Sequence, residues 1–331
     1  MKTEKVILGV DIGYSFVKVC VGTGDGQIIK KFKFPSVIGQ TKKLEGVQND
    51  NIVHYNERYY MVGEDAKHLP SSNIIDLDTY KNLEYFGPLL LNHAVKIAKL
   101  SKVDLIVSGL SIAEIKQSGY FQNVLSHFVV DSVEYNYNVM LLPQGAGAKL
   151  CYEKFGNDFP NLQKEYLGDS TYCIVDIGFN TLDLVLVNKG VTSPELFEGI
   201  SQHGLMKIAA HVAKLVNEKH NRSISLPEAR EILDTGVYKL RGQKYDYTEE
   251  IEGIKKEYLR EILALVNERY SNILDKLDFL VVLGGGAHIF KSSSDGYIRC
   301  VIKDTEYYNA IGEFIFGTNN IDSVKTSVDD E

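Results

Sequence analysis

The sequence lacks the features that mark secreted, membrane-spanning and zinc-binding proteins. Its four cysteines lie far apart and form no Cys-x-x-Cys pair, which favours buried, reduced thiols in a cytoplasmic protein over disulfide bonds. Its eight histidines include no pair at helical i, i+4 spacing, so no zinc site is expected. No uncharged apolar run approaches the about 18 residues that a transmembrane helix requires, and Asp11 interrupts the N-terminal apolar stretch before a signal-peptide core could form. No association with a membrane is therefore expected.

A surplus of basic residues is also missing. Lys and Arg number 36 against 44 Asp and Glu, which leaves a net charge of −8. Binding to the phosphate backbone of a nucleic acid requires clustered cations. Direct contact with nucleic acid is therefore not expected, and any such role would depend on a partner protein.

Two common glycine motifs of nucleotide-binding proteins do not occur in the chain. There is no Gly-x-Gly-x-x-Gly dinucleotide fingerprint and no Gly-x-x-x-x-Gly-Lys-Ser/Thr P-loop. These absences exclude a Rossmann dehydrogenase and a P-loop ATPase.

The sequence does contain one motif that occurs twice. The segments ILGVDIGYSFVKVCVG (7–22) and CIVDIGFNTLDLVLV (173–187) both place Val-Asp-Ile-Gly and an aromatic residue at the end of an apolar strand, and both continue into a second apolar strand. A chain of 331 residues is long enough for two domains. The repeat therefore predicts two α/β domains related by duplication.

Apolar periodicity and turn residues predict strands and helices that alternate in both halves. Predicted strands cover residues 6–10, 15–21, 27–32, 52–55, 58–63, 103–107, 133–142, 171–177, 182–187 and 279–283. Predicted helices cover residues 80–100, 112–128, 144–155, 202–219, 227–233, 249–277 and 307–316.

In each copy of the repeat an aspartate ends the strand and a glycine follows two residues later, as Asp11/Gly13 and Asp176/Gly178. Glycine suits a turn that something must approach closely. Backbone amides in such turns can cradle phosphate oxygens, and the carboxylates can hold Mg²⁺ through its water shell. The duplicated turns therefore predict a site for a polyphosphate with a divalent metal.

Polar residues near the two turns add candidates for this site. Lys18 either points to solvent or reaches the phosphates, and its lack of a counterpart in the second copy, where the strand reads Leu-Val-Leu-Val, favours the functional role. Asn180 and Thr181 could donate hydrogen bonds to phosphates. For Asp183, a local hydrogen-bonding role in the hairpin and a role in the site stay equally open.

Two further loops carry small residues beside a strand end. In Pro-Gln-Gly-Ala-Gly-Ala (143–148), Gln144 could orient a water molecule, although a polar residue at a helix start is the ordinary alternative. The triple glycine 284–286 would let a nucleotide base and ribose lie on the backbone. His288 is expected to pack against this loop rather than to act in catalysis.

Taken in order, these segments and the late Asn309-Ala310-Ile311-Gly312 resemble the five nucleotide-site segments of the actin, sugar-kinase and heat-shock chaperone ATPase superfamily, over residues 6–316. Phe34-Pro35-Ser36 and Val-Gly-Glu-Asp-Ala (62–66) are most similar to prokaryotic actin-like ATPases of the ParM type, the plasmid-segregation actin homologues, and to their archaeal relatives. The resemblance implies an α/β, actin-like fold with two duplicated ribonuclease-H-like domains around a nucleotide cleft.

The resemblance also implies domain boundaries. Residues 1–150 would form domain I with a small insertion at about 34–100, and residues 151–310 would form domain II with a small insertion at about 201–248. Residues 311–331 would be a C-terminal helix that returns to domain I, followed by an acidic tail.

Site roles follow from the resemblance position by position. The implied catalytic residues are Asp11, Lys18, Gln144 and Asp176, and Asp11 and Asp176 would hold Mg²⁺ through water. The implied cofactor-binding residues are Asp11, Gly13, Tyr14, Ser15, Lys18, Asp176, Gly178, Phe179, Asn180, Thr181, Glu198, Gly204, Gly284, Gly285, Gly286, Ala287 and Asn309.

The implied function is hydrolysis of ATP or GTP with Mg²⁺ by a cytoplasmic, head-to-tail filament that segregates plasmid or other DNA through a DNA-binding adaptor protein. A small-molecule kinase of the same fold and a non-hydrolysing, nucleotide-bound scaffold are the alternatives. The choice of ATP or GTP, the number and polarity of filament strands, the cargo, and a plasmid, phage or chromosomal origin stay open.

Overall fold

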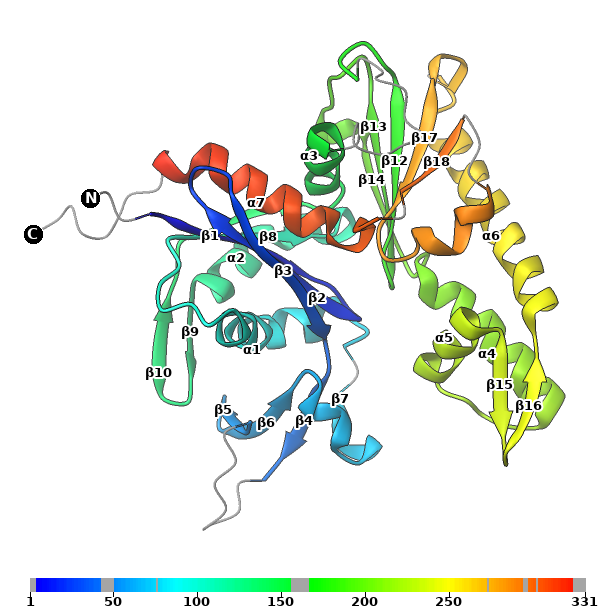
Figure 1. Cartoon of the computed structure of the whole chain (residues 1–331), viewed down its shortest axis with the longest axis horizontal. Helices are drawn as coiled ribbons and strands as arrows, with labels where there is room; N and C mark the ends of the chain where they lie inside the picture. The colour runs from blue at the N-terminus through cyan, green and yellow to red at the C-terminus, as the bar shows by residue number, and fades with distance from the viewer. Residues whose placement is uncertain are drawn as a thin grey trace, which may run out of the picture. The chain divides into compact units, whose positions relative to one another are not determined.

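The chain forms two compact units. The computed structural model describes residues 4–42, 51–75, 77–155, 167–272, 274–293, 297–301 and 303–323. One unit comprises Met1–Gln163 together with Glu306–Glu331, and the other comprises Lys164–Thr305 (Figure 1). The predicted acidic tail lies beyond Ser323, outside the described residues.

The first unit is built on a five-stranded mixed sheet in the order β11-β8-β1-β2-β3. Strands β1 (Val6–Ile12), β2 (Phe16–Thr23) and β3 (Ile28–Pro35) form the antiparallel meander that the sequence predicted. Strands β8 (Leu105–Leu110) and β11 (Val139–Pro143) run parallel to β1. The turn between β1 and β2 carries Gly13.

The second unit repeats this topology, with strand order β14-β13-β12-β17-β18. Strands β12 (Tyr172–Ile177), β13 (Thr181–Val187) and β14 (Phe197–Ser201) are antiparallel neighbours. Strands β17 (Phe279–Leu283) and β18 (Ile298–Cys300) run parallel to β12. The shared order and direction of the strands confirm the duplication.

Helices cover both faces of the first sheet, because alternate residues of β1 face opposite sides. Leu8, Val10 and Ile12 join a core with helices α1 (Tyr80–Ala98) and α2 (Ser118–Ser126). Gly9 and Asp11 face the other side. There, helix α7 (Tyr308–Asn320) packs on β1 and on helix α3 (Ala146–Phe155). Residues near the C-terminus thus complete the unit that the N-terminus begins.

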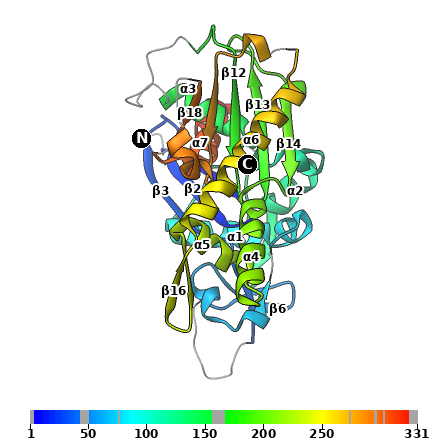
Figure 2. The same ribbon diagram turned by 90° about the vertical axis from the view of Figure 1, so that its right-hand side faces the viewer.

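One apolar face of the second sheet is covered by three helices. These are α4 (Leu205–His220), α5 (Leu226–Thr235) and α6 (Thr248–Arg269), which lie beside one another in Figure 2. Cys173, Val175 and Ile177 of β12 share this core with them. The helix predicted over 249–277 is too long at its C-terminal end, because α6 ends at Arg269.

Smaller strands add further differences from the predicted elements. Strands β5 (Val53–Tyr55) and β6 (Arg58–Val62) form the predicted hairpin, in a sheet of order β5-β6-β4-β7 that adds β4 (Ile38–Thr41) and β7 (Ile74–Ile75). The hairpin of β15 (Val237–Leu240) and β16 (Gln243–Asp246) was not predicted.

The predicted helix 112–128 and strand 133–142 are both interrupted. The first becomes a 3-10 segment, Ile112–Gln117, then α2 and the strand β9 (His127–Val130). The second divides into β10 (Val133–Asn136), which pairs with β9, and β11, which pairs with β8. Within the described part of the chain, no helix is long and apolar enough to cross a membrane.

His93 of α1 makes the stability of the first unit depend on pH. Burial lowers the pKa of His93 below 6.5, its ordinary value, while Asp65 raises it and Lys96 lowers it. Well above pH 6.5 the imidazole is neutral in both the folded and the unfolded state, so its full contribution to stability is present. As the pH falls through 6.5 the unfolded chain takes up the proton first, and stability is lost until the folded-state pKa is reached.

We therefore expect the free energy of unfolding to fall between pH 7.5 and pH 5.5, and to fall less in the His93→Gln variant. Urea unfolding at both pH values measures the difference. Equal losses in the two proteins would contradict the assignment to His93.

Candidate functional site

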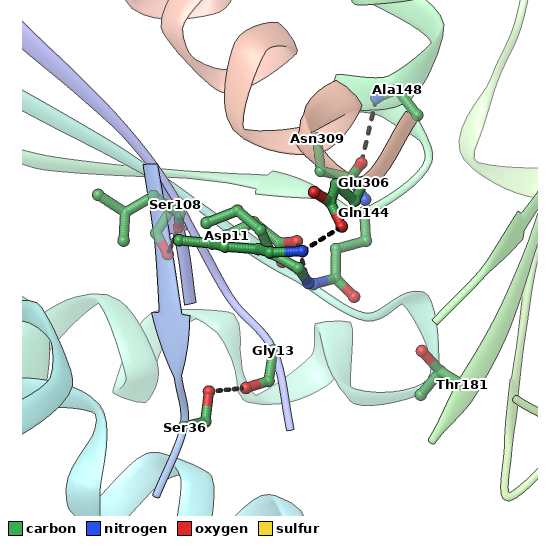
Figure 3. A network of polar contacts seen from close by, with 12 residues as sticks. Asp11, Gly13, Ser36, Ser108, Gln144, Ala148, Thr181, Glu306 and Asn309 are labelled. Atoms are coloured by element: carbon green, nitrogen blue, oxygen red, sulfur yellow. Dashed lines mark hydrogen bonds and ion pairs between the residues drawn. The ribbon is translucent and has the colours of Figure 1, made fainter. Parts of the chain in front are cut away.

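In the first unit the structure brings Asp11, Lys18 and Gln144 together at the end of β1. Asp11 and Lys18 lie directly opposite each other in the β1–β2 register, and Lys18 Nζ donates to Asp11 Oδ2 at 2.9 Å. Gln144 Nε2 donates to Asp11 Oδ1 at 2.7 Å (Figure 3). The Asp11 side chain is only 5% exposed. Both carboxylate oxygens are thus held by donors from different elements.

The turn that follows Asp11 is fixed by Ser36. Ser36 Oγ donates to the Gly13 carbonyl oxygen at 2.6 Å, and its backbone N–H donates to the Ser15 carbonyl at 2.9 Å. A Cβ on Gly13 would lie 3.0 Å from Lys18 Nζ, so the glycine lets the lysine reach across the turn. Tyr14 and Ser15, both half-buried, complete this turn. The role of Ser36 could not be inferred from its sequence neighbours alone.

Asn309 of α7 holds the loop that carries Gln144. Its Oδ1 accepts hydrogen bonds from the backbone N–H groups of Gly145 at 3.0 Å and Ala148 at 3.1 Å, which satisfies donors at the start of α3 (Figure 3). The Gln144 N–H donates to Leu110 O at 2.8 Å. The resemblance placed Asn309 among the nucleotide-binding residues, but its side-chain carbonyl is engaged in fixing this loop.

In the second unit Asp176 lies opposite Asp183 in the β12–β13 register. This is the position that Lys18 occupies opposite Asp11 in the first hairpin. The prediction that Lys18 has no counterpart is therefore wrong: the counterpart is Asp183, of opposite charge. Asp183 Oδ2 accepts from Thr181 Oγ1 at 3.1 Å. Like charges directly opposite each other in a sheet repel, so this pair of buried carboxylates favours a cation nearby.

The turn between β12 and β13 packs against the start of α4. The N–H groups of Gly204, Leu205 and Met206 donate to the carbonyls of Asn180, Gly178 and Phe179 at 3.2, 3.0 and 2.8 Å. A Cβ on Gly204 would lie 2.5 Å from the Phe179 oxygen. The start of α4 therefore engages all three of these carbonyls, and the Gly178 N–H donates to the Thr181 carbonyl at 3.0 Å. Gly204 thus acts through close packing.

Asn180 provides the clearest sign that this turn is built for a ligand. The residue is 6% exposed, and among the described residues its Oδ1 has no hydrogen-bond partner. Buried polar atoms are almost always hydrogen-bonded, so an orphan of this kind indicates a missing polar partner. A hydrated metal ion and its phosphates offer such partners, and the implied Mg²⁺–nucleotide therefore fits this turn.

The triple glycine after β17 packs on the same turn. Gly284 has φ +87°, and a Cβ there would collide with Asp176 Oδ1 and lie 2.8 Å from Ile177 O. A Cβ on Gly286 would lie within 3 Å of the Ile177 side chain, whereas one on Gly285 would meet nothing within 4 Å. Ala287 is buried. Gly285 is therefore the open position on this loop.

The structure does not bring Glu198 to these residues. Glu198 pairs with Leu184 in the β13–β14 register, on the sheet face opposite to Asp176 and Asp183, and lies 3.6 Å from Arg269 of α6. His288 lies against the glycine loop, with Nδ1 2.9 Å from Gly285 O.

Within the described residues, no group of three or more His, Cys, Asp or Glu side chains could hold a metal ion. Mg²⁺ usually keeps several of its water ligands and takes only one or two carboxylates from a protein. Asp11 of the first unit and Asp176 of the second are each a buried carboxylate of the kind that could take part in such binding.

Comparison with known proteins identifies both halves of the chain. A family model described as actin-like proteins, N-terminal domain, matches residues 9–147, and one described as archaeal actin homologue MreB-like, C-terminal, matches residues 174–294. A search of curated proteins finds no match.

Solved structures share the fold over almost the whole chain. A 15-stranded ParM filament from Clostridium botulinum has a subunit 22% identical to this chain, with a TM-score of 0.74 and coverage of 96% of this chain and 100% of that one. The archaeal actin homologue Ta0583, in complex with ADP, is 18% identical with a TM-score of 0.71 and coverage of 95% and 99%. The actin-like protein Alp7A is 19% identical, with a TM-score of 0.68 and coverage of 96% and 97%. The chain has the actin-like fold, and the two family models, which together cover most of it, show that it belongs to the actin-like proteins.

Proposed function

We propose that the protein is an ATPase that binds nucleotide with Mg²⁺ and polymerises into filaments. The observation that carries this proposal is the grouping of a carboxylate, a cation and an amide at Asp11, Lys18 and Gln144. These three types of group match what phosphoryl transfer to water requires, which is positioning and charge neutralisation. ADP in the related Ta0583 structure supports a nucleotide ligand.

Each residue has a defined task in this proposal. Lys18 stabilises negative charge on the β- and γ-phosphates, and Gln144 orients the attacking water. Asp11 and Asp176 hold the water shell of Mg²⁺, which neutralises phosphate charge when bound. The turn at 178–181 contributes amides, and Gly285 supports the base or ribose.

Filament formation is supported by the ParM filament among the similar structures. In a head-to-tail polymer every contact joins two different surfaces of the same chain, which produces an open filament. We propose that such filaments segregate plasmid or other DNA in the cytoplasm through a DNA-binding adaptor protein. The net charge of −8 agrees with an indirect link to DNA.

Ultracentrifuge pelleting and phosphate release from the purified protein test this function. We expect protein in the pellet with Mg²⁺ and ATP or GTP, less with ADP, and phosphate release without any added acceptor. Asp176→Ala should lose both activities, and Asp275→Ala, at an acidic position outside the two turns, should keep them. Soluble protein in every nucleotide, with turnover only when metabolites are added, would instead establish a small-molecule kinase.

Nucleotide binding with no phosphate release under any condition would support the non-hydrolysing scaffold. Equal pelleting with and without nucleotide would contradict a nucleotide-dependent polymer.

A further inference from the structure

We propose that Asp11 is a positioning residue that determines which atom of the Gln144 amide faces the reacting water. This inference rests on the proposed hydrolysis. It assigns Asp11 a task beyond holding a hydrated metal ion, and it concerns the direction of a hydrogen bond in this chain.

The argument begins with Lys18, because an ammonium group can only donate hydrogen bonds. Lys18 Nζ lies 2.9 Å from Asp11 Oδ2 and 18% of its side chain is exposed. The cross-strand register keeps the two side chains on the same face of the sheet. Asp11 thus has one oxygen engaged and the other, Oδ1, available for a second donor.

That second donor is Gln144, and the carboxylate determines which end of the Gln144 side-chain amide faces it. A carboxylate only accepts, so Gln144 must present its NH₂ group to Asp11 Oδ1, at 2.7 Å. The amide oxygen of Gln144 then points away from Asp11 (Figure 3). An outward amide oxygen can accept a hydrogen bond from water, which leaves the lone pairs of the water oxygen for the attack. An outward NH₂ group would instead donate to the water and engage one of those lone pairs.

Hydrogen bonds also hold the backbone from which the Gln144 side chain extends. Gln144 N–H donates to Leu110 O, and Asn309 holds the following residues Gly145 and Ala148. With both the backbone and the amide restrained, the position of Gln144 Oε1 is determined before any water binds. Such preorganisation is what makes a polar group effective in a transition state.

The Asp11→Asn variant should reverse the amide. Lys18 still requires an acceptor, so the introduced asparagine would give it the amide oxygen and turn its own NH₂ towards Gln144. Gln144 would then have to accept with Oε1 and present its NH₂ to the water. In Asp11→Asn/Gln144→Glu, one carboxylate oxygen of the introduced glutamate accepts from the introduced asparagine, and the other again faces outward as an acceptor.

We expect Asp11→Asn to slow single-turnover hydrolysis at saturating Mg²⁺ and ATP by about 100-fold. Gln144→Glu alone should also be slow, because it places two carboxylates at hydrogen-bond distance. The double variant should return to within about 10-fold of the original rate. A residue that acted only on the metal would give no such recovery, since the aspartate is still missing in the double variant.

Asp104→Asn is the matched control. Asp104 is another buried aspartate of the first unit, and it pairs with Lys102 and the Val6 N–H rather than with Gln144. This variant should keep the hydrolysis rate. If Asp11→Asn folds poorly, the comparison of Gln144→Glu with the double variant carries the test alone.

A measurement on the nucleotide-free protein tests the orientation of the Gln144 amide independently of the proposed hydrolysis. The side-chain NH₂ signals of Gln144 in ¹⁵N–¹H NMR, assigned by their loss in Gln144→Glu, should move in Asp11→Asn and stay unchanged in Asp104→Asn. Unchanged signals, or a double variant as slow as Asp11→Asn, would overturn the proposal. If the NMR signals move as expected but the unmodified protein hydrolyses no nucleotide, the hydrogen bond between Asp11 and Gln144 is supported. The proposed hydrolysis, and with it the catalytic role of this hydrogen bond, is then refuted.

Discussion

Replacing Gly312 with alanine is expected to lower the free energy of unfolding of the first unit by about 3 kcal/mol. Gly312 of α7 crosses Gly147 of α3, and a Cβ at position 312 would overlap the Gly147 carbonyl and lie 2.6 Å from its Cα. The obstacle is backbone on both sides, so relief requires the two helices to separate. The helix propensity gained on going from glycine to alanine, about 1 kcal/mol, does not offset this cost.

The measurement is the melting temperature, which should fall by about 6–12 °C. Gly119→Ala is the matched control, because Gly119 lies in helix α2 of the same unit and a Cβ there meets nothing within 4 Å. That variant should be neutral or slightly more stable. Similar melting temperatures for the two variants would show that the helix crossing is not as close as described.

Replacing Gly284 with alanine is expected to damage both stability and nucleotide binding. The new residue would have to adopt φ +87°, which costs about 1–2 kcal/mol without any collision. Its Cβ would also displace the Asp176 carboxylate. We expect a loss of about 2–3 kcal/mol in unfolding free energy and at least a roughly 10-fold loss of Mg²⁺–nucleotide affinity, since about 1.4 kcal/mol of lost binding has that effect.

The neighbouring Gly285→Ala variant separates the two effects. A Cβ at Gly285 meets nothing within 4 Å, so stability should change by less than about 0.5 kcal/mol. If a nucleotide lies on this loop, its affinity should nevertheless fall. Calorimetric melting and titration with fluorescent nucleotide measure the two quantities. An unchanged nucleotide affinity in Gly285→Ala would contradict the proposal that the base or ribose lies on Gly285.

The duplicated hairpins could be predicted because their signals are local. Apolar alternation and an Asp-Ile-Gly turn occur within a few residues, and β1, β2, β12 and β13 follow them closely. Strands such as β7 have no comparable signal. Ile74–Ile75 is a strand only because β4 lies beside it, so its partner is distant in the sequence. The β15–β16 hairpin carries a weak signal because β16 is polar and the turn, Arg241-Gly242, lacks the usual Asn-Gly or Asp-Gly pair.

The candidate site shows the same limit. The sequence singled out Asp11, Lys18 and Gln144 individually, but their mutual hydrogen bonds depend on the register of β1 and β2 and on a loop more than a hundred residues away. The equivalence of Lys18 and Asp183 is not evident from the sequence, because the two residues occupy the same position in their hairpins but carry opposite charges. The cap that Asn309 provides to α3 depends on a helix crossing that no local pattern encodes.

The packing of α7 also determines when the protein can fold during synthesis. Gly9 of β1 lies so close to α7 that a Cβ there would approach Phe314 N to 2.7 Å, and Glu306 pairs with Lys33 of β3 at 2.7 Å. The ribosome makes β1 before the second unit and α7 after it, whereas the strands and helices of the second unit form one continuous stretch, Lys164–Thr305. The later-made unit can therefore fold before the earlier one is complete, and the N-terminal sheet must keep one apolar face uncovered until translation reaches α7.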